Sequence, residues 1–320
     1  MWPLIKILPV KTNFRVVSFA TLAGIISILA VIGSLYMTLI PFKPPCGGLA
    51  CGIDFKGGTV LELSTAPHVA NLQVIRAALG NQGLGDVQVQ GFGGPSSVIV
   101  RFQNPEGADG AKVVEQVKDA IHTAVGTVSF KRTDVVGPKV SGELFSKGIL
   151  ALGLAIGCML IYIWFRFQLQ FGLGAVMALF HDVILTFGLI AVTRLEFSLT
   201  TIAAILTIIG YSMNDTVVVF DRLRENLRKY NRMPLRDVID LSINETLSRT
   251  VITGLTAILA LGGLAVFGGP TLFGFSLIMM IGIALGTYSS IYVAAPVILL
   301  WGVQRGDDAA VPLKPANSRP

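Results

Sequence analysis

Long apolar runs without charged residues dominate this chain, and short polar segments separate them. Five such runs, two of them interrupted by one or two ionisable residues, cover residues 16–42, 148–165, 167–193, 197–220 and 250–304. A membrane-spanning helix needs about 20 apolar residues. The last run is long enough for two spans, and the turn sequence Gly268-Gly269-Pro270 divides it. The pattern therefore predicts six transmembrane helices, one at 16–42, three within 148–220 and two within 250–304.

The composition agrees with a membrane protein. Hydrophobic types make up 52% of the 320 residues and charged types 14%, whereas soluble domains carry roughly a quarter charged residues. This excludes a soluble enzyme, a collagen, a disordered chain and a disulfide scaffold. The first run is longer than a signal-peptide core of about 7–15 residues, so we expect it to be retained as a transmembrane helix.

Basic residues are concentrated on one side of the predicted spans. Fourteen lie in the segments before the first span and after the second, fourth and sixth spans, whereas the short loops on the opposite side contain only Arg194. By the positive-inside rule, we expect both termini, 1–15 and 305–320, to be cytoplasmic. The net charge of +6 is then a topology signal, and no nucleic-acid partner is needed to explain it.

The long hydrophilic segment 43–147 lies outside the cytoplasm in this topology. Its periodicity predicts a strand, a helix, two strands, a helix and a strand, at residues 59–64, 67–79, 87–91, 98–102, 113–121 and 125–136. The order βαββαβ is that of the ferredoxin-like unit. The fold class is thus an α-helical polytopic membrane protein with one inserted α+β ferredoxin-like domain. No residues in the domain have metal-site spacing, so we expect a binding or coupling module.

The basic segment 221–249 follows the fourth predicted span. Leu223, Leu227 and Tyr230 recur at helical spacing, and Pro234 is suited to open a second helix, which predicts two amphipathic helices. Such a segment is typical of an anchor on anionic lipid. The alternative is a docking surface for a cytoplasmic or membrane partner.

The three cysteines fall in two environments. Cys158 lies inside a predicted span and is expected to be a small apolar residue. Cys46 and Cys51 follow the first span on the oxidising side, where they could form a local disulfide. A metal site is less favoured, because two thiols without a nearby histidine leave a tetrahedral site half empty.

Ionisable residues inside predicted spans are the strongest functional signal. A carboxyl group in the bilayer centre costs about 2.5–3.5 kcal/mol, yet Asp182 lies in the third span and Asp215 in the fourth. Arg249 opens the fifth span on the same side as Asp215, and it can reach Asp215 if that helix begins near Asn244. A carboxyl group whose guanidinium neighbour moves closer and then away can bind and release a proton. These residues are therefore candidates for proton coupling.

A structural interpretation stays open beside the functional one. Asp182 and Asp215 could be neutral or paired and simply hold helices together, while Arg249 extends to the membrane surface. Ser212 and Asn214 are polar neighbours that allow close helix contacts, as Gly210 does. His181 is either a hydrogen-bonding helix contact or a proton relay.

The sequence resembles the SecF subunits of the bacterial Sec protein translocase, in the SecD/SecF family. The motifs appear in the family's order over almost the whole chain beyond the first span. They are Asp54-Phe55-Lys56-Gly57-Gly58-Thr59, Val136-Gly137-Pro138 with Glu143-Leu144, His181-Asp182, the run from Tyr211 to Thr216, the run from Phe220 to Asn226, Leu247 to Thr250, Phe267 to Pro270, and Gly286 to Tyr292.

The resemblance implies an RND-like half transporter in the bacterial inner membrane, with residues 43–147 on the periplasmic side. SecD would supply six more spans, and the pair would associate with the SecYEG channel and other translocon-associated insertion factors. It implies proton-driven completion of the export of unfolded polypeptides, with protons as the coupling ion and no other cofactor. Asp215 and Arg249 match the family's proton-conducting residues, and Asp182 matches with a less defined role. Glu245 stands where the family pattern suggests glutamine.

Three functions are compatible with these features. The first is a non-enzymatic, proton-driven subunit of protein export. The second is a half-size RND-like exporter of small molecules or lipids, which should need a larger external region than residues 43–147. The third, an intramembrane hydrolase, is least supported, because the surroundings of Asp182 and Asp215 resemble no protease motif. Co-purification with SecD and the channel would distinguish export from efflux.

Overall fold

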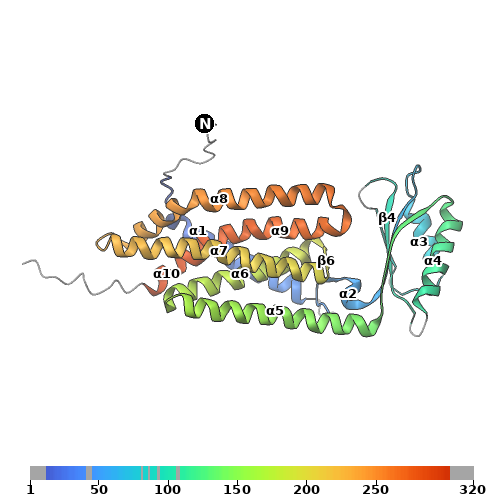
Figure 1. The fold of residues 1–320 in the computed structure, drawn as a ribbon, viewed down its shortest axis with the longest axis horizontal. Coiled ribbons are helices and arrows are strands. Elements are labelled where there is room, and N and C mark those ends of the chain that lie inside the picture. The colour runs from blue at the N-terminus through green and yellow to red at the C-terminus, as the bar shows by residue number, and fades with distance from the viewer. Residues whose placement is uncertain are drawn as a thin grey trace, which may run out of the picture.

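The computed structural model describes residues 12–40, 45–80, 82–85, 87–91, 94–105 and 109–302. The predicted tail 305–320 and most of the predicted N-terminal segment 1–15 lie outside the described residues. A bundle of long helices forms one end of the molecule, and a small domain of strands and helices forms the other (Figure 1). We call these the bundle and the small domain.

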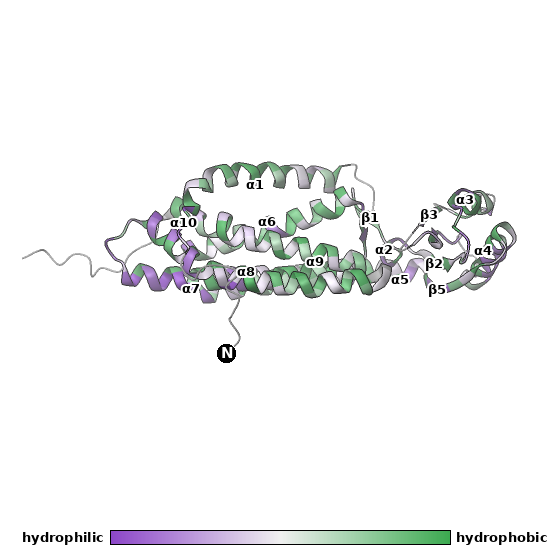
Figure 2. Cartoon of the chain, turned by 90° about the horizontal axis from the view of Figure 1, so that it is seen from above, coloured by the Kyte–Doolittle hydropathy of each residue, from purple (hydrophilic) through white to green (hydrophobic). Residues whose placement is uncertain are grey.

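Six helical segments of the described chain are long and apolar enough to cross a membrane. They are α1 (Val16–Leu39), α5 (Pro138–Arg166), α6 (Leu169–Thr193), α7 (Leu199–Lys229), α8 (Leu235–Phe267) and a last segment made of α9 (Gly269–Ser289), the π-helical turn η1 (Ser290–Ala294) and α10 (Ala295–Trp301). Hydrophobic residues run along these helices, and hydrophilic residues gather at the end of the bundle away from the small domain (Figure 2). The prediction of a six-span membrane protein is confirmed.

Three helices extend beyond the apolar runs that predicted them. Helix α5 already begins at Pro138, α7 continues to Lys229, and α8 begins at Leu235. The two helices predicted within 221–249 are therefore the ends of α7 and α8, and they are not separate elements. The physical reason is packing: Leu223 and Leu227 are buried and continue the inward face of α7.

The small domain contains four antiparallel strands and two helices. Its elements are β2 (Gly58–Ser64), α3 (Leu72–Gly80), β3 (Gln88–Gly91), β4 (Ser97–Phe102), α4 (Gly110–Val125) and β5 (Ser129–Val136), and the strand order in the sheet is β3-β4-β2-β5. This chain order is the predicted one. Helix α3 starts later than predicted because the Asn71 carboxamide accepts hydrogen bonds from the N–H groups of Gln73 and Val74. Strand β5 starts later because α4 runs to Val125.

The small domain has its own core. Leu61 and Leu63 of β2 pack with Val98 and Val100 of β4 and with residues of α3 and α4 that include Ile121. The core of the bundle is a second, separate cluster of buried residues. The small domain is therefore a folding unit attached to the bundle.

Short elements join the two parts. Strand β1 (Ala50–Cys51) pairs in parallel with β6 (Glu196–Phe197), which lies between α6 and α7. Helix α2 (Ile53–Lys56) follows β1 and leads into the sheet. These elements hold the small domain at the end of the bundle where α7 begins (Figure 1).

Candidate functional site

Two carboxyl groups lie in the interior of the bundle. Asp182 of α6 is 1% exposed and Asp215 of α7 is 3% exposed. Both helices pack against the segment formed by α9 and η1. Neither carboxyl group faces lipid, so each needs partners within the protein.

Asp182 is fully engaged by neighbouring side chains. Its Oδ1 lies 2.9 Å from Nδ1 of His181, and its Oδ2 accepts hydrogen bonds from the hydroxyls of Ser212 on α7 at 2.5 Å and Ser289 on α9 at 2.7 Å. One carboxyl group thus joins three helices. Because all its contacts are buried, loss of any partner would leave a buried carboxyl oxygen with one hydrogen bond fewer.

The contacts of Asp182 extend to the first helix. Nε2 of His181 lies 3.2 Å from the hydroxyl of Ser27 on α1, and that hydroxyl lies 2.9 Å from the hydroxyl of Tyr288. Tyr288 also donates to the backbone carbonyl of Ala23 and stacks on the ring of His181. We call Ser27, His181, Asp182, Ser212, Tyr288 and Ser289 the Asp182 network. It connects α1, α6, α7 and α9.

Asp215 has a different environment. Its carboxyl group lies beside Thr287 of α9 and within electrostatic reach of Arg249 of α8. Its Oδ2 has no hydrogen-bond partner among the described residues, and the buried hydroxyls of Thr216 and Thr250 have none either. Asp215 is therefore a buried carboxyl group with an uncommitted oxygen, at the place where α7, α8 and α9 meet.

Arg249 lies within α8, but the residue is exposed and is not enclosed by the bundle. Since α8 begins at Leu235, Arg249 is several turns from its start. Arg249 belongs to none of the ion pairs formed among the described residues, so it lies beyond direct ion-pair distance of Asp215.

Glycines allow close helix packing around these side chains. A Cβ atom at Gly286 of α9 would lie 2.8 Å from Cβ of Ser212, and one at Gly254 of α8 would lie 3.6 Å from the Thr287 hydroxyl. Helix α9 is therefore held tightly between α7 and α8.

The remaining polar residues predicted for the site separate into two groups. Ser212 and His181 belong to the Asp182 network, whereas Asn214 is exposed on α7 and lies outside it. The sequence pattern did not identify Ser27, Thr287, Tyr288 or Ser289. The last three lie in the motif from Gly286 to Tyr292 and form a short hydroxyl-rich stretch inside an apolar run, but the sequence assigned them no role.

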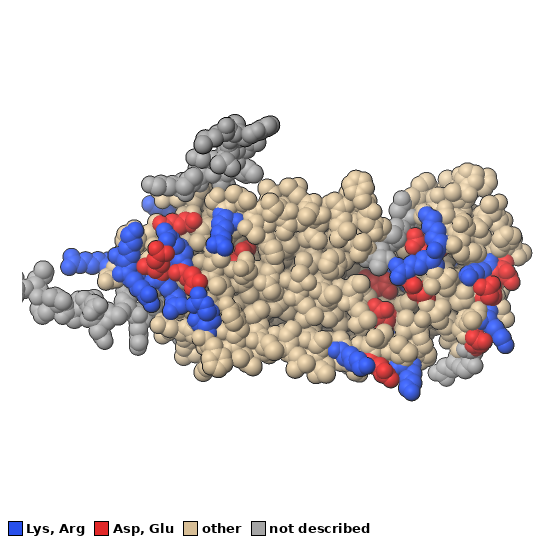
Figure 3. All heavy atoms as spheres, viewed as in Figure 1, with Lys and Arg blue, Asp and Glu red and all other residues tan. Residues whose placement is uncertain are grey.

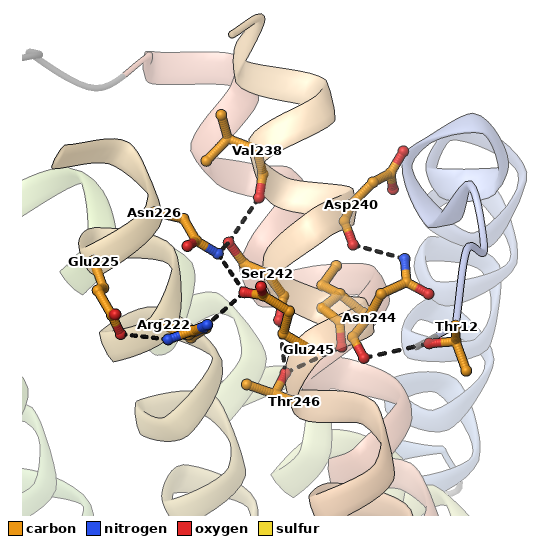
Figure 4. A network of polar contacts seen from close by, with 11 residues as sticks. Thr12, Arg222, Glu225, Asn226, Val238, Asp240, Ser242, Asn244, Glu245 and Thr246 are labelled. Atoms are coloured by element: carbon orange, nitrogen blue, oxygen red, sulfur yellow. Dashed lines mark hydrogen bonds and ion pairs between the residues drawn. The ribbon is translucent and has the colours of Figure 1, made fainter. Parts of the chain in front are cut away.

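A polar network joins the ends of α7 and α8 away from the small domain (Figure 4). Arg222 pairs with Glu245 at 2.7 Å and with Glu225 at 2.6 Å. The carboxamide of Asn226 donates to Glu245 and to Ser242. Glu245 is thus an ion-pair partner of Arg222. This pairing gives a reason for a carboxylate at position 245, where the family pattern suggests glutamine.

The same end of α8 also holds the start of α1. The Asn244 carboxamide accepts a hydrogen bond from the backbone N–H of Phe14 and donates one to its carbonyl oxygen. The backbone carbonyl of Asn244 accepts a hydrogen bond from the Thr12 hydroxyl (Figure 4). The Asp240 carboxylate accepts from the N–H of Val17 in the first turn of α1. Helices α1, α7 and α8 are therefore fastened together at this end.

The motif at 54–59 lies at the junction with the small domain. The Asp54 carboxylate accepts a hydrogen bond from the N–H of Leu199, the first residue of α7, at 2.9 Å. Phe55 packs against Phe145 and Phe197. Gly57 and Gly58 have φ of 76° and 124°, a backbone conformation that favours glycine.

The last residue of the motif and the two cysteines lie close to the same junction. The Thr59 hydroxyl donates to Asn104 at 3.0 Å. Cys46 and Cys51 are joined by a disulfide, and Cys158 is a free, exposed cysteine. No group of three or more histidine, cysteine or acidic residues suited to a metal ion occurs within the described residues.

This chain is similar to known proteins of one class, the membrane proteins of protein export. Residues 116–304 match the family model of the protein export membrane proteins SecD/SecF, C-terminal part. The "Protein translocase subunit SecF" of Cereibacter sphaeroides is 44% identical to this chain, and the match covers 94% of both chains. That of Rhodobacter capsulatus is also 44% identical, over 96% of this chain and 95% of the relative. The chain belongs to the SecF family of protein translocase subunits, and its role is an accessory one in Sec-dependent protein export.

Solved structures agree with this assignment. The crystal structure of SecDF, a translocon-associated membrane protein from Thermus thermophilus, matches 92% of this chain with a TM-score of 0.79 and 30% identity. A second SecDF structure, in a super-membrane-facing form, matches 93% of the chain with a TM-score of 0.63 and 31% identity. The chain spans 39% of the length of the first SecDF chain and 40% of the second. Of the three functions compatible with the sequence, these relatives favour protein export.

Proposed function

We propose that this chain is a proton-driven subunit of protein export, in which Asp215 binds and releases protons as α7, α8 and α9 move relative to one another. The observation that carries the proposal is the uncommitted Oδ2 of a carboxyl group that is 3% exposed. A fully paired aspartate would resist protonation, whereas this one keeps an oxygen available.

The neighbours of Asp215 make its proton affinity depend on helix positions. Thr287 and Arg249 belong to two other helices, and Arg249 lies beyond ion-pair distance. If α8 shifts so that the guanidinium approaches, the charged carboxylate is favoured, and if it moves away, the protonated form is favoured. Moving one charge across the membrane releases about 2.3 kcal/mol per 100 mV, which is enough to bias two arrangements of the helices.

Asp182 has a supporting role in this proposal. Its carboxyl oxygens are occupied by His181, Ser212 and Ser289. Ser212 lies one turn before Asp215 on α7, so the Asp182 network sets the position of α7 against α6 and α9. This saturation supports a positioning role for Asp182, with proton exchange at Asp215.

Helix α7 provides a path from the proton site to the small domain. Asp54 holds the first residue of α7, and Asp215 follows Leu199 by about 24 Å at 1.5 Å per residue. Arg101 of β4 pairs with Glu196 at 2.6 Å, just before α7. A shift of α7 at Asp215 would therefore move contacts of the small domain, which in our proposal acts on the exported chain.

The partners follow from the family. SecD would complete the other half of an RND-like pair, and the SecYEG channel, further insertion factors and the unfolded exported polypeptide would be the wider partners. We propose that the chain acts as a non-enzymatic subunit, with protons alone as the coupling ion. Both termini would be cytoplasmic in the bacterial inner membrane, and the small domain would be periplasmic. The similar SecDF of Thermus thermophilus is a translocon-associated membrane protein, which supports this setting.

The test replaces Asp215 by Asn in the full chain together with SecD. Inverted membrane vesicles with an imposed proton gradient would give two readouts, translocation of a secreted protein and proton flux. We expect D215N to abolish the gradient-dependent part of translocation and the associated flux, and to leave the ATP-driven part intact. N214A is the matched control, because Asn214 is adjacent and exposed. Gradient-dependent translocation by D215N equal to that of the parent would refute the proposal.

A further inference from the structure

A basic cavity lies at the end of the bundle opposite the small domain. Its volume is about 530 Å³, and it is lined by Arg166 of α5 and by Asp221, Arg224, Glu225, Arg228 and Lys229 of α7. Charged side chains gather at this end of the molecule, and the surface between it and the small domain is mainly uncharged (Figure 3). The cavity begins at Asp221, six residues after Asp215 on α7, and takes no part in the function proposed above.

The two acidic residues of the cavity are already paired. Asp221 accepts hydrogen bonds from Nη2 of Arg166 at 2.7 and 2.6 Å, and Glu225 pairs with Arg222 at 2.6 Å. By contrast, Arg224, Arg228 and Lys229 take part in no ion pair formed among the described residues. The cavity therefore has basic groups available to bind an anion.

Arg166 is held in place but keeps donors free. Both hydrogen bonds to Asp221 use Nη2, so Nε and Nη1 have no partner in the hydrogen bonds of the described residues. Its guanidinium also lies 5.2 Å from the ring centre of Phe167. A guanidinium fixed in this way can present its remaining N–H groups to phosphate oxygens at little entropic cost.

Apolar surface begins directly beside the basic groups. Trp164 and Phe165, which precede Arg166 on α5, are 73% and 83% exposed, and Leu169 at the start of α6 is 62% exposed. Exposed aromatic residues at the end of a span are typical of the membrane–water interface. A ligand with a phosphate and acyl chains would contact both surfaces, whereas a free phosphate ion would contact only the basic one.

We infer that this cavity, which we call the headgroup site, binds the phosphate of an anionic phospholipid whose acyl chains lie along Trp164 and Phe165. Basic pockets between spans at the cytoplasmic surface bind such headgroups in other membrane proteins. The headgroup site is a particular place for one lipid, and so differs from a general attraction of basic residues to the membrane.

The experiment uses Trp164 as a reporter in the full chain, with the other two tryptophans, Trp2 and Trp301, replaced by Phe. The protein is reconstituted in phosphatidylcholine vesicles containing phosphatidylglycerol with brominated acyl chains, which quench nearby tryptophan. Brominated phosphatidylcholine is the reference lipid. We expect preferential quenching by the anionic lipid, and a loss of preference of about fivefold for each basic group removed.

Two pairs of substitutions separate a site from general surface charge. R224Q/R228Q removes two groups of the headgroup site, whereas R232Q/R236Q removes two exposed basic residues outside the cavity. We expect the first pair to abolish the preference and the second to preserve it. If R224Q/R228Q does not fold, the quenching preference is measured in R228Q alone. This single variant should fold, because Arg228 is exposed in the last turn of α7.

Three results would overturn the inference. The first is equal quenching of the parent by both brominated lipids. The second is an equal loss in both double variants, or an unchanged preference in R228Q. The third is release of the quench by inorganic phosphate at constant ionic strength, which would identify a site for free phosphate.

Discussion

The carboxylate of Asp54 accepts a hydrogen bond from the backbone N–H of Leu199 at 2.9 Å, although the two residues are far apart in the sequence. Leu199 is the first residue of α7, and an N–H group there has no partner within the helix. A residue that leads into the small domain therefore completes the helix that carries Asp215. This contact gives the motif at 54–59 a physical role at the junction.

Replacing Asp54 by Ala should weaken that junction. We expect a loss of stability of about 1 kcal/mol, as for other helix caps, and a larger relative loss of gradient-dependent export, because the small domain would no longer be fixed to α7. The measurements are thermal unfolding of the purified full chain and translocation in membrane vesicles. D109A is the matched control, since Asp109 caps α4 within the small domain. If D54A and D109A lower stability by the same amount and also lower export by the same amount, the junction has no special role in export.

Replacing a buried serine of the bundle by alanine should change the stability by an amount that depends on the hydrogen-bond partner of that serine. Ser289 donates to Asp182, and its removal would leave a buried carboxyl oxygen with one hydrogen bond fewer. We expect S289A to destabilise the protein by about 1–3 kcal/mol. Ser276 on the same segment is equally buried, but its hydroxyl has no partner among the described residues. S276A should therefore be neutral or slightly stabilising.

Denaturant unfolding followed by tryptophan fluorescence would measure both serine variants. If S276A costs as much as S289A, hydrogen bonding to Asp182 does not contribute to the stability of the bundle. A second readout is gradient-dependent export, which S289A should lower because the Asp182 network positions α7.

Gly286 and Gly262 differ in the space available for a Cβ atom, and this difference gives a third prediction. At Gly286 an alanine would bring its Cβ to 2.8 Å from Cβ of Ser212, whereas nothing lies within 4 Å of the position at Gly262 of α8. G286A should separate α7 from α9, with a cost of about 1–3 kcal/mol from overpacking. G262A should be neutral or gain up to about 1 kcal/mol, because alanine favours the helix. Cysteine cross-linking between α7 and α9 in the G286A background should fall; unchanged cross-linking would contradict the packing argument.

The sequence predicts the number of spans and the order of the small domain because both depend on local patterns. Apolar runs of sufficient length must be helical in a membrane, and alternation marks strands such as 59–64. The lengths of α5, α7 and α8 were not predictable in this way. The polar end of α7 is helical because Leu223 and Leu227 are buried against other elements, and Val238 and Ile239 are buried in the same way at the start of α8. This packing is a tertiary effect.

The candidate site was predictable only in part for the same reason. Asp182 and Asp215 stand out because carboxyl groups are rare in apolar runs. Ser27 and Ser289 meet in the Asp182 network although they are distant in the chain, and serine is common in spans. Their role depends on which face of each helix is buried. Asn214 is the opposite case, because this polar neighbour of Asp215 was predicted for the site but is exposed.

The network between α7 and α8 gives the last prediction, because it contains a buried and a half-exposed contact. Asn226 is 1% exposed and donates to Ser242 and Glu245. N226A would leave both acceptors without this donor, with an expected cost of about 1–3 kcal/mol. The side chains of Arg222 and Glu245 are 33% and 32% exposed, so water screens their ion pair. E245Q keeps an oxygen for Asn226 and should cost about 1 kcal/mol or less.

Unfolding of both variants at low and high salt would test this difference. The effect of E245Q should shrink at high salt because an exposed ion pair is screened, whereas the effect of N226A should remain. A larger loss in E245Q than in N226A would mean that the ion pair, and not the buried carboxamide, holds α7 against α8.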